Sequence, residues 1–408
     1  MTDVVGSAPD FDLYGPDVVA DPYPTYAAMR AAGPMVEVAG TRYVTRYELA
    51  EQVLRNTDFG RGQYPRMIEG ALGPGPLAES FRRWILYLDP PDHTRLRSLV
   101  MRAFTPRAIE RLRMVIQTTV DRLLDEMVAA DETDLLGHFA YPLPVHVICE
   151  LLGVPTEDRS EFRTWSADLG RGLQITNTTP EIIHRGNVAA DGFNTYFREL
   201  IEQRRARPLD GFLDDLIAVG GNGEPLSDDE LLATLVLLFF AGHETTVNLL
   251  GNGMNAVLRH QPAWDQLCAD PALARQAVEE MLRIDTPVQR ASRIALVDLE
   301  LEGGIVRAGE MVIVLIGGAN RDERRFEDPD TFKLNRSTGS HLSFAAGPHY
   351  CLGATLARVE AEIAVATLAR RFPGLRLGPD VPARRPNVVL RGLESLPVLG
   401  LSSSPSAL

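Results

Sequence analysis

The sequence predicts a mainly α-helical protein with a small β region. Apolar residues recur three and four positions apart over most of the chain after Asp21, which is the spacing of one helix face. The stretch after Pro287 instead alternates between apolar and polar residues, so we expect a small sheet mainly within residues 286–316. No internal repeat divides the chain, and we expect one domain over residues 1–408 with a flexible C-terminal tail at 402–408.

The composition is that of a soluble globular protein, and it disfavours several partners. Of the 408 residues, 45% are hydrophobic and 24% are charged, and 55 acidic against 41 basic residues give a formal net charge of -14. Nucleic acid and an anionic membrane surface are disfavoured, because phosphate binding needs positive charge. The longest apolar run, from Leu231 to Gly242, is shorter than the ~20 residues that span a bilayer. We expect a monomeric cytoplasmic protein that binds neither nucleic acid nor membrane.

The first half of the chain gives two helix predictions and one loop prediction. The segment DPYPTYAAMRAAG, which begins at Asp21, opens with Asp and Pro, and these residues often begin helices. Pro106–Ala130 keeps the helical spacing throughout. Between these two, Phe59–Ser80 is rich in Gly and Pro, and we expect a long mobile loop there.

A long central helix opens the second half. The helical spacing runs from Ser227 to about His260, and Glu230 completes a capping box with the serine. The string AGHETT (Ala241–Thr246) places polar residues in the middle of this otherwise apolar helix. A further helix should span Asp270–Ile284, and a last one Gly353–Phe372.

Cys351 has the most distinctive chemistry in the sequence. A glycine-containing turn leads into the last helix, and Cys351 stands just before the first turn of that helix. Unpaired backbone N–H groups and the positive helix end favour a thiolate, which binds soft metal centres. From this residue alone, a buried free cysteine is an equal alternative. Cys149 and Cys268 lie far away in sequence, so short-spaced zinc ligation is not expected.

The residues around Cys351 form a specific string. Phe344, Gly347, His349, Cys351 and Gly353 stand in the spacing F-x-x-G-x-H-x-C-x-G. This string resembles the haem-ligand loop of the cytochrome P450 family. One position departs from the family pattern, because Ala345 stands where glycine is usual, and a positive φ there would strain an alanine.

Further segments agree with the same family, in the same order along the chain. They are His93 and Arg97 in DPPDHTRLR, Ala241–Thr246 in the central helix, Glu280 and Arg283 in EEMLR, Arg293 in PVQRASR, and Arg336 in PDTFKLNR. The resemblance implies a P450 fold with the long central helix over a buried haem b, whose iron is ligated axially by Cys351. It implies haem contacts from His93, Arg97, Ala241, Arg293, Phe344, Gly347, His349 and Gly353. It also implies a structural network of Glu280, Arg283 and Arg336.

The resemblance implies monooxygenation, in which one oxygen atom from O2 is inserted into an apolar small molecule. We expect a bacterial secondary metabolite such as a polyketide as the substrate. Glu244 and Thr245 are implied as an acid–alcohol pair that delivers protons, at a point where the central helix opens locally. The residues expected in the substrate pocket are Leu237, Leu238, Ala241, Val288 and Gln289, and the expected lids are residues 59–80 and 172–185.

Electrons must come from another protein, because no flavin or nicotinamide domain is visible. We expect a ferredoxin and a ferredoxin reductase as electron donors, docked on a basic face that includes Arg95, Arg102, Arg107 and Arg358. Two alternatives remain open. One is a haem-thiolate enzyme of the same fold that does oxidative coupling, rearrangement or peroxide-driven chemistry, and the other is a non-catalytic haem-binding domain that recruits a carrier protein.

Overall fold

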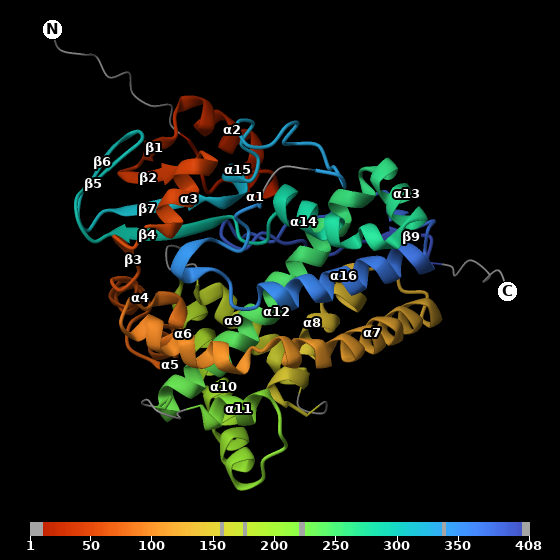
Figure 1. Ribbon diagram of the computed structural model, residues 1–408, viewed down its shortest axis with the longest axis horizontal. Coiled ribbons are helices and arrows are strands. Elements are labelled where there is room, and N and C mark those ends of the chain that lie inside the picture. Colours follow the sequence, from red (N-terminus) through yellow and green to blue (C-terminus); the bar gives the residue numbers. More distant parts are fainter. Residues whose placement is uncertain (1–10, 156–158, 174–177, 220–224, 337–339, 402–408) are drawn as a thin grey trace.

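The strands before residue 316 gather at one side of the molecule, and helices fill most of the rest (Figure 1). The computed structural model describes residues 11–155, 159–173, 178–219, 225–336 and 340–401. The prediction of a mainly α protein with a small β region is confirmed. The predicted flexible tail at 402–408 lies outside the described residues.

Helices account for most of the described chain. They are α1 (Pro16–Ala20), α2 (Tyr23–Ala32), α3 (Tyr47–Arg55), α4 (Tyr64–Leu72), α5 (Pro76–Arg83), α6 (Asp92–Ala103), α7 (Pro106–Ala129), α8 (Pro142–Leu152), α9 (Arg159–Gly172), α10 (Pro180–Ala206), α11 (Phe212–Ala218), α12 (Asp228–Leu258), α13 (Gln261–Ala269), α14 (Ala274–Ile284), α15 (Ile316–Ala319) and α16 (Ala354–Arg371). The helices predicted from sequence correspond to α2, α7, α12, α14 and α16. The predicted start at Asp270 falls on a short 3₁₀ turn, Pro271–Leu273, that leads into α14.

The long helix α12 is the centre of the helical part. Its capping box is formed, since the Ser227 hydroxyl accepts a hydrogen bond from the Glu230 N–H at 3.3 Å and the Glu230 carboxylate accepts one from the Ser227 N–H at 2.9 Å. It is long and apolar enough to cross a bilayer, but 72% of its most apolar 18-residue window is buried inside the protein. It packs against α8, α10, α14 and α16, as a core helix does.

The prediction of a mobile loop at Phe59–Ser80 is wrong. This segment holds β3 (Phe59–Gly60), α4 and most of α5. Apolar residues four positions apart, Ile68 with Leu72 and Leu77 with Phe81, are buried and anchor the two short helices. The glycines and prolines that suggested a loop lie mainly at helix starts and in the link between α4 and α5.

The main sheet has five strands in the order β1-β2-β7-β4-β3. The remaining bounds are β1 (Met35–Val38), β2 (Thr41–Val44), β4 (Arg290–Ala295), β5 (Leu299–Leu301), β6 (Gly304–Val306), β7 (Met311–Leu315), β8 (Arg376–Leu377) and β9 (Val398–Leu399). The strands predicted within 286–316 are confirmed as β4 to β7. The sequence analysis missed β1 and β2, which join the sheet through the parallel pairing of β2 with β7 (Figure 1).

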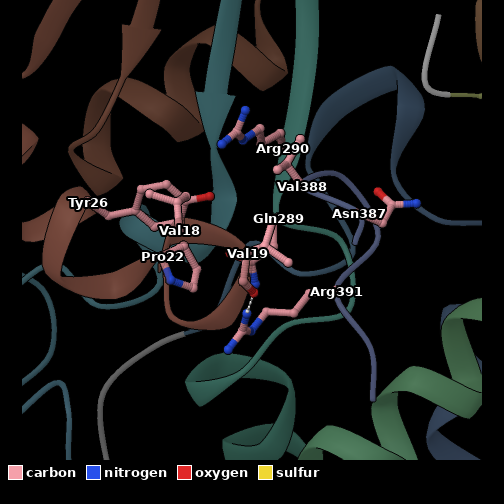
Figure 2. A pocket seen from close by; sticks show the side chains of 9 residues that line it. All are labelled: Val18, Val19, Pro22, Tyr26, Gln289, Arg290, Asn387, Val388 and Arg391. Carbon is pink, nitrogen blue, oxygen red and sulfur yellow. Dashed lines mark hydrogen bonds between the residues drawn. The ribbon is translucent and has the colours of Figure 1, made fainter. Parts of the chain in front are cut away.

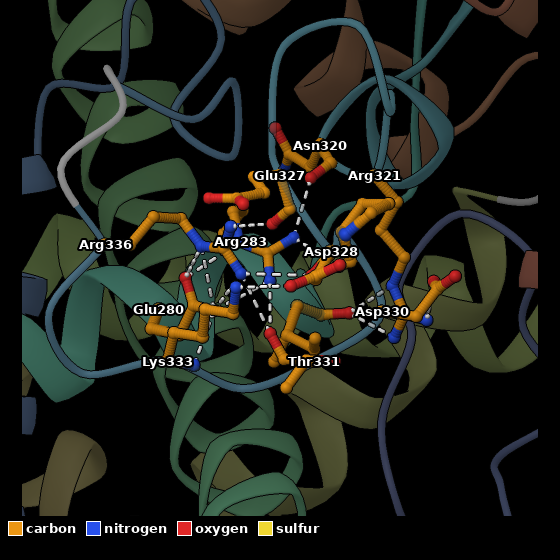
Figure 3. Close-up of polar contacts among 12 residues, drawn as sticks. Glu280, Arg283, Asn320, Arg321, Glu327, Asp328, Asp330, Thr331, Lys333 and Arg336 are labelled. Atoms are coloured by element: carbon orange, nitrogen blue, oxygen red, sulfur yellow. Dashed lines mark hydrogen bonds and ion pairs between the residues drawn. The ribbon is translucent and has the colours of Figure 1, made fainter.

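A buried ion network connects α14 to residues 320–336, which follow β7 in the sequence (Figure 3). The Arg283 guanidinium donates to Glu280 at 2.7 Å and 2.8 Å, and Arg336 donates to the same carboxylate at 3.0 Å. Arg283 also donates to the carbonyls of Asn320 and Pro329. The side chains of Glu280 and Arg283 are only 3% and 2% exposed. The structure therefore brings together the three residues implied as a structural network.

Replacement of Arg283 by alanine should destabilise the fold by about 3–5 kcal/mol, because the Glu280 carboxylate would stay buried without its closest partner. Urea unfolding of the variant measures this loss. Arg113→Ala is the matched control, since its ion pair with Glu110 lies at the surface and should contribute at most about 1 kcal/mol. Equal, small losses in the two variants would contradict a structural role for the network.

Candidate functional site

A cavity of about 1080 Å³ lies between α12, the loop before α16, β4 and the start of α6. Twelve of the residues singled out from sequence line it. They are His93, Arg97, Leu237, Leu238, Ala241, Thr245, Val288, Arg293, Phe344, His349, Cys351 and Gly353. Segments that are far apart in the sequence thus meet around one space, as the sequence analysis expected.

The loop before α16 has a conformation that few residues allow. Gly347 has φ +69°, and a side chain there would approach the backbone of Leu54 and Arg55 at 2.6–2.7 Å, so glycine is required. Ala345 has φ +58°, which is the left-handed region anticipated at this departure from the family pattern. The Cys351 N–H donates to the Phe344 carbonyl at 3.0 Å and closes the turn.

Cys351 is reached from the cavity but is enclosed by protein on its other sides. Among the residues that the structure describes, no group of three or more His, Cys, Asp or Glu side chains is arranged to hold a metal ion, so Cys351 would act as a single protein ligand. Burial raises the pKa of its thiol, against the opposing effects of the Gly353 N–H, Arg97 and Arg358. The N–H at the helix start therefore acts on the thiol in the direction expected from the sequence, and burial opposes it.

Cationic side chains gather at one end of the cavity. The rings of His93 and His349 lie 4.2 Å apart between their centroids, and Arg97 donates to the Tyr350 carbonyl at 2.6 Å. Burial, followed by the charges of Arg61 and Arg293, lowers the pKa of His349 to about 2. Burial and the charge of Arg61 lower the pKa of Arg293 to about 9. The positive charges of Arg61, Arg97 and Arg293 therefore disfavour a further positive charge at this end of the cavity.

Carboxylates that could neutralise this cluster are missing from the cavity wall. Among the described lining residues the one carboxyl group belongs to Glu360, and burial raises its pKa well above the ordinary value, which disfavours its charged form. The Arg61 Nε and Arg293 Nη2 atoms are buried without a hydrogen-bond partner. Because buried cations are normally paired, this end of the cavity is built for a ligand that carries negative charge.

Arg61 is the member of the cluster that the sequence analysis missed. Its guanidinium lines the cavity, donates to the Leu86 carbonyl at 2.7 Å and lies within 6 Å of the ring centres of Tyr64 and Tyr87. The nearest acid, Asp89, uses its two carboxylate oxygens to accept the N–H groups of Arg61 and Gly62, each at 2.7 Å. The chain has 41 basic residues, and no motif distinguishes Arg61 from the others. It also lies in the segment that was predicted to be a loop.

The residues present fit haem b. Its two carboxylates match the uncompensated arginines, and its iron matches Cys351, which lines the same cavity. The apolar wall residues, among them Leu237, Leu238 and Phe240, match the apolar body of the porphyrin and of a small-molecule substrate.

Thr245 and Glu244 do not face the same way. Thr245 lines the cavity, and its hydroxyl donates to the Ala241 carbonyl at 2.9 Å. Glu244 is not among the lining residues, and its carboxylate accepts a hydrogen bond from Arg385 at 2.7 Å. Neighbouring positions point about 100° apart on a helix, so adjacency in sequence could not place both on one face. The expected local opening is also wrong, because α12 is α-helical from Asp228 to Leu258.

Gln289, predicted to line the substrate pocket, lies elsewhere. Its amide donates to the Thr286 carbonyl at 2.8 Å and to the Tyr23 hydroxyl at 3.3 Å. It borders a separate pocket of about 10 Å³, the size of one water molecule (Figure 2). Its neighbour Val288 does line the large cavity.

The two predicted lids contribute to the cavity wall. Met67 and Ile68 from the first and Leu173 from the second line it. Residues 174–177 of the second lid lie outside the described part of the chain.

Comparisons with known proteins agree with this geometry. The family model described as Cytochrome P450 matches residues 39–375. The chain is 40% identical to cytochrome P450 monooxygenase PikC of Streptomyces venezuelae (95% of this chain, 93% of the relative), and 45% identical over 317 residues to the polyketide biosynthesis cytochrome P450 PksS of Bacillus subtilis (77% of each). The crystal structure of CalO2 superposes with a TM-score of 0.91 at 39% identity (96% and 98% covered). P450BioI, in complex with an acyl carrier protein ligated to hexadec-9Z-enoic acid, superposes with a TM-score of 0.86 at 36% identity (94% and 99% covered).

Replacement of Ala345 by glycine should stabilise the protein by about 0.5–1 kcal/mol. Relief of the left-handed strain, about 1–2 kcal/mol, exceeds the cost of the extra freedom that glycine has in the unfolded chain. Thermal unfolding of the two proteins under identical conditions measures the difference. Ala28→Gly, at an exposed position in the middle of α2, should instead lose about 1 kcal/mol, and a similar loss at position 345 would show that the loop is not strained there.

Proposed function

The chain belongs to the cytochrome P450 family, and we propose that it is a haem-thiolate monooxygenase whose substrate is an apolar small molecule of bacterial secondary metabolism, such as a polyketide. The observation that carries the proposal is the single large cavity in which Cys351, the cation cluster and an apolar wall meet. The relatives PikC and PksS, a monooxygenase and a polyketide biosynthesis protein by name, support the substrate class.

The cofactor contacts follow from the cavity wall. When bound, haem b would supply oxygen activation, and Cys351 would be the thiolate ligand of its iron. His93, Arg97, Arg293 and His349 would hold the haem carboxylates, together with Arg61. Phe344 and Gly353 would contact the haem, and the small side chain of Ala241 would leave room for it. Gly347, also predicted as a haem contact, is not among the lining residues and instead lets the cysteine loop lie against Leu54 and Arg55.

Proton delivery rests on Thr245. Its hydroxyl donates to the Ala241 carbonyl and its oxygen can accept a hydrogen bond at the cavity surface. To relay a proton, the hydroxyl would turn from Ala241 to donate its own proton into the cavity and would take a new proton from the group that donates to its oxygen. Glu244 would supply protons from the outer side of α12, where its partner Arg385 is 31% exposed. The apolar side chains of Leu237 and Leu238 would exclude bulk water and hold the substrate.

A ferredoxin and its reductase are the proposed electron donors, in the cytoplasm of the cell. The docking face expected from sequence needs revision, since Arg95 pairs with Glu230 and Arg358 pairs with Glu279. Arg102 is exposed, and the side chain of Arg107 lies outside the described structure. Of the predicted docking residues whose side chains the structure describes, Arg102 at the end of α6 is the exposed one without an ion pair.

Replacement of Cys351 by alanine should abolish the red-shifted absorption band of the reduced carbon monoxide complex, because that band requires a thiolate ligand. Cys149→Ala and Cys268→Ala are the controls and should keep the band. An unchanged band in the Cys351 variant would refute the assigned ligand.

Replacement of Thr245 by alanine should uncouple turnover. We expect an unchanged dissociation constant for substrate but at least a tenfold rise in hydrogen peroxide released per product formed, because proton transfer by a positioned group contributes roughly 10²–10⁴-fold. Product and peroxide per nicotinamide consumed, measured with the ferredoxin system, give the ratio. Full coupling in the variant would point to proton delivery by the substrate itself.

Replacement of Arg61 by glutamine should speed haem loss roughly tenfold, because a hydrogen bond to a charged group contributes about 1.5–3 kcal/mol. The rate of haem transfer to excess apomyoglobin measures this effect. Arg66→Gln, an exposed position on α4, is the control. Identical rates in the two variants would remove Arg61 from the haem contacts.

A further inference from the structure

The cavity has a second arm that crosses one face of the main sheet. Alternate residues of neighbouring strands line it, namely Thr41 and Tyr43 of β2, Met311 and Ile313 of β7, and Arg290 and Ser292 of β4. The register pairs Tyr43 with Ile313 and Ile313 with Ser292, and paired residues point to the same face. Ala291 and Arg293, on the opposite face, also line the cavity, so the space passes around the edge of β4.

Arg290 is the charged residue of this arm. It is 7% exposed, and one of its terminal nitrogens donates to the Leu13 carbonyl at 2.7 Å. Its Nε atom is buried without a partner, and in the described part of the chain no carboxylate forms an ion pair with it. Its side chain extends away from Gln289 and Arg391, whose own contacts lie on the other side (Figure 2).

Two tyrosine hydroxyls stand beside this guanidinium. Its central carbon lies 5.2 Å from the ring centre of Tyr14, and the Tyr14 hydroxyl lies 3.4 Å from that of Tyr43. Burial, followed by the contact with Tyr14, raises the pKa of Tyr43, so its hydroxyl stays protonated and can donate. The other walls of the arm are largely apolar and include Val19, Met311 and Ile313. The contact between the two hydroxyls uses one of their protons, so the pair offers one free O–H donor, and Tyr14 is 55% exposed, which places it at the mouth of the arm. A guanidinium beside one hydroxyl donor is suited to one carboxylate.

We propose that this arm binds the carboxylate of an elongated apolar substrate, with Arg290 as the anchor and the hydroxyl pair of Tyr14 and Tyr43 as a hydrogen-bond donor. The proposal rests on the monooxygenase function and narrows its substrate class. A buried guanidinium without an anion is costly, and a substrate carboxylate offsets this cost whereas a neutral or cationic end does not. Since the arm and Thr245 lie in different parts of one cavity, the substrate must be long enough to reach from one to the other.

The test compares an acid with its neutral ester. Hexadecanoic acid and its methyl ester are titrated into the haem-loaded protein, and binding is measured by calorimetry and by the shift of the ferric haem band. The acid should bind at least tenfold more tightly than the ester, a difference of about 1.4 kcal/mol. Arg290→Gln should lose this preference by weakening acid binding alone, and Tyr14→Phe should weaken it several-fold. Arg66→Gln, exposed on α4 and outside the cavity wall, should leave it intact.

Equal affinity of the wild-type protein for acid and ester would overturn the proposal. The proposal would also be overturned if Arg290→Gln weakened the binding of the acid and of the ester by the same factor. Arg290 would then only hold the N-terminal segment through Leu13. If that variant does not fold, the ratio of acid affinity to ester affinity in the wild-type protein and the effect of Tyr14→Phe on it decide whether the proposal holds. Failure of the monooxygenase function looks different, because it removes the thiolate spectrum or the oxygenated product while the acid preference by calorimetry persists.

Discussion

The repulsion among the arginines at one end of the cavity is the constraint on which the rest of the site depends. Arg61, Arg97 and Arg293 come from three distant segments, and each is held in place by backbone carbonyls with no carboxylate partner among the described residues. Such an arrangement is unfavourable until a dianionic ligand enters, so binding of the haem carboxylates must contribute to the stability of the folded protein. The folded protein therefore reaches its full stability only with the cofactor bound.

The rest of the fold holds the cysteine loop and α12 in place around the same cavity. Gly347 lets the cysteine loop lie directly against the backbone of Leu54 and Arg55, and the Glu280–Arg283 pair holds the segment from Asn320 to Pro329 through its carbonyls. The long helix α12 closes the space with small and apolar residues. Because cations, cysteine and helix sit on separately anchored elements, the site is rigid where the cofactor binds and open along the edge of β4 where substrate is proposed to extend.

Features set by residues a few positions apart could be predicted from the sequence, whereas features set by tertiary packing could not. The capping box at Ser227 and the string around Cys351 depend on residues a few positions apart, so both could be identified in advance. The pairing of β2 with β7 joins segments on either side of the helical part and left no local signal. The outward turn of Glu244 toward Arg385, the separation of Gln289 from the cavity and the part played by Arg61 depend on neighbours that only the folded chain supplies.

Binding of an iron-free porphyrin to the apoprotein tests most directly whether the cation cluster is built for two carboxylates. Protoporphyrin IX and its dimethyl ester have the same ring and differ in negative charge, so the comparison removes any effect of the iron–sulfur bond. Loss of charge-assisted hydrogen bonds at both carboxylates, at about 1.5–3 kcal/mol each, predicts that the ester binds at least a hundredfold more weakly. Equal affinities, measured by fluorescence quenching at low ionic strength, would contradict the account.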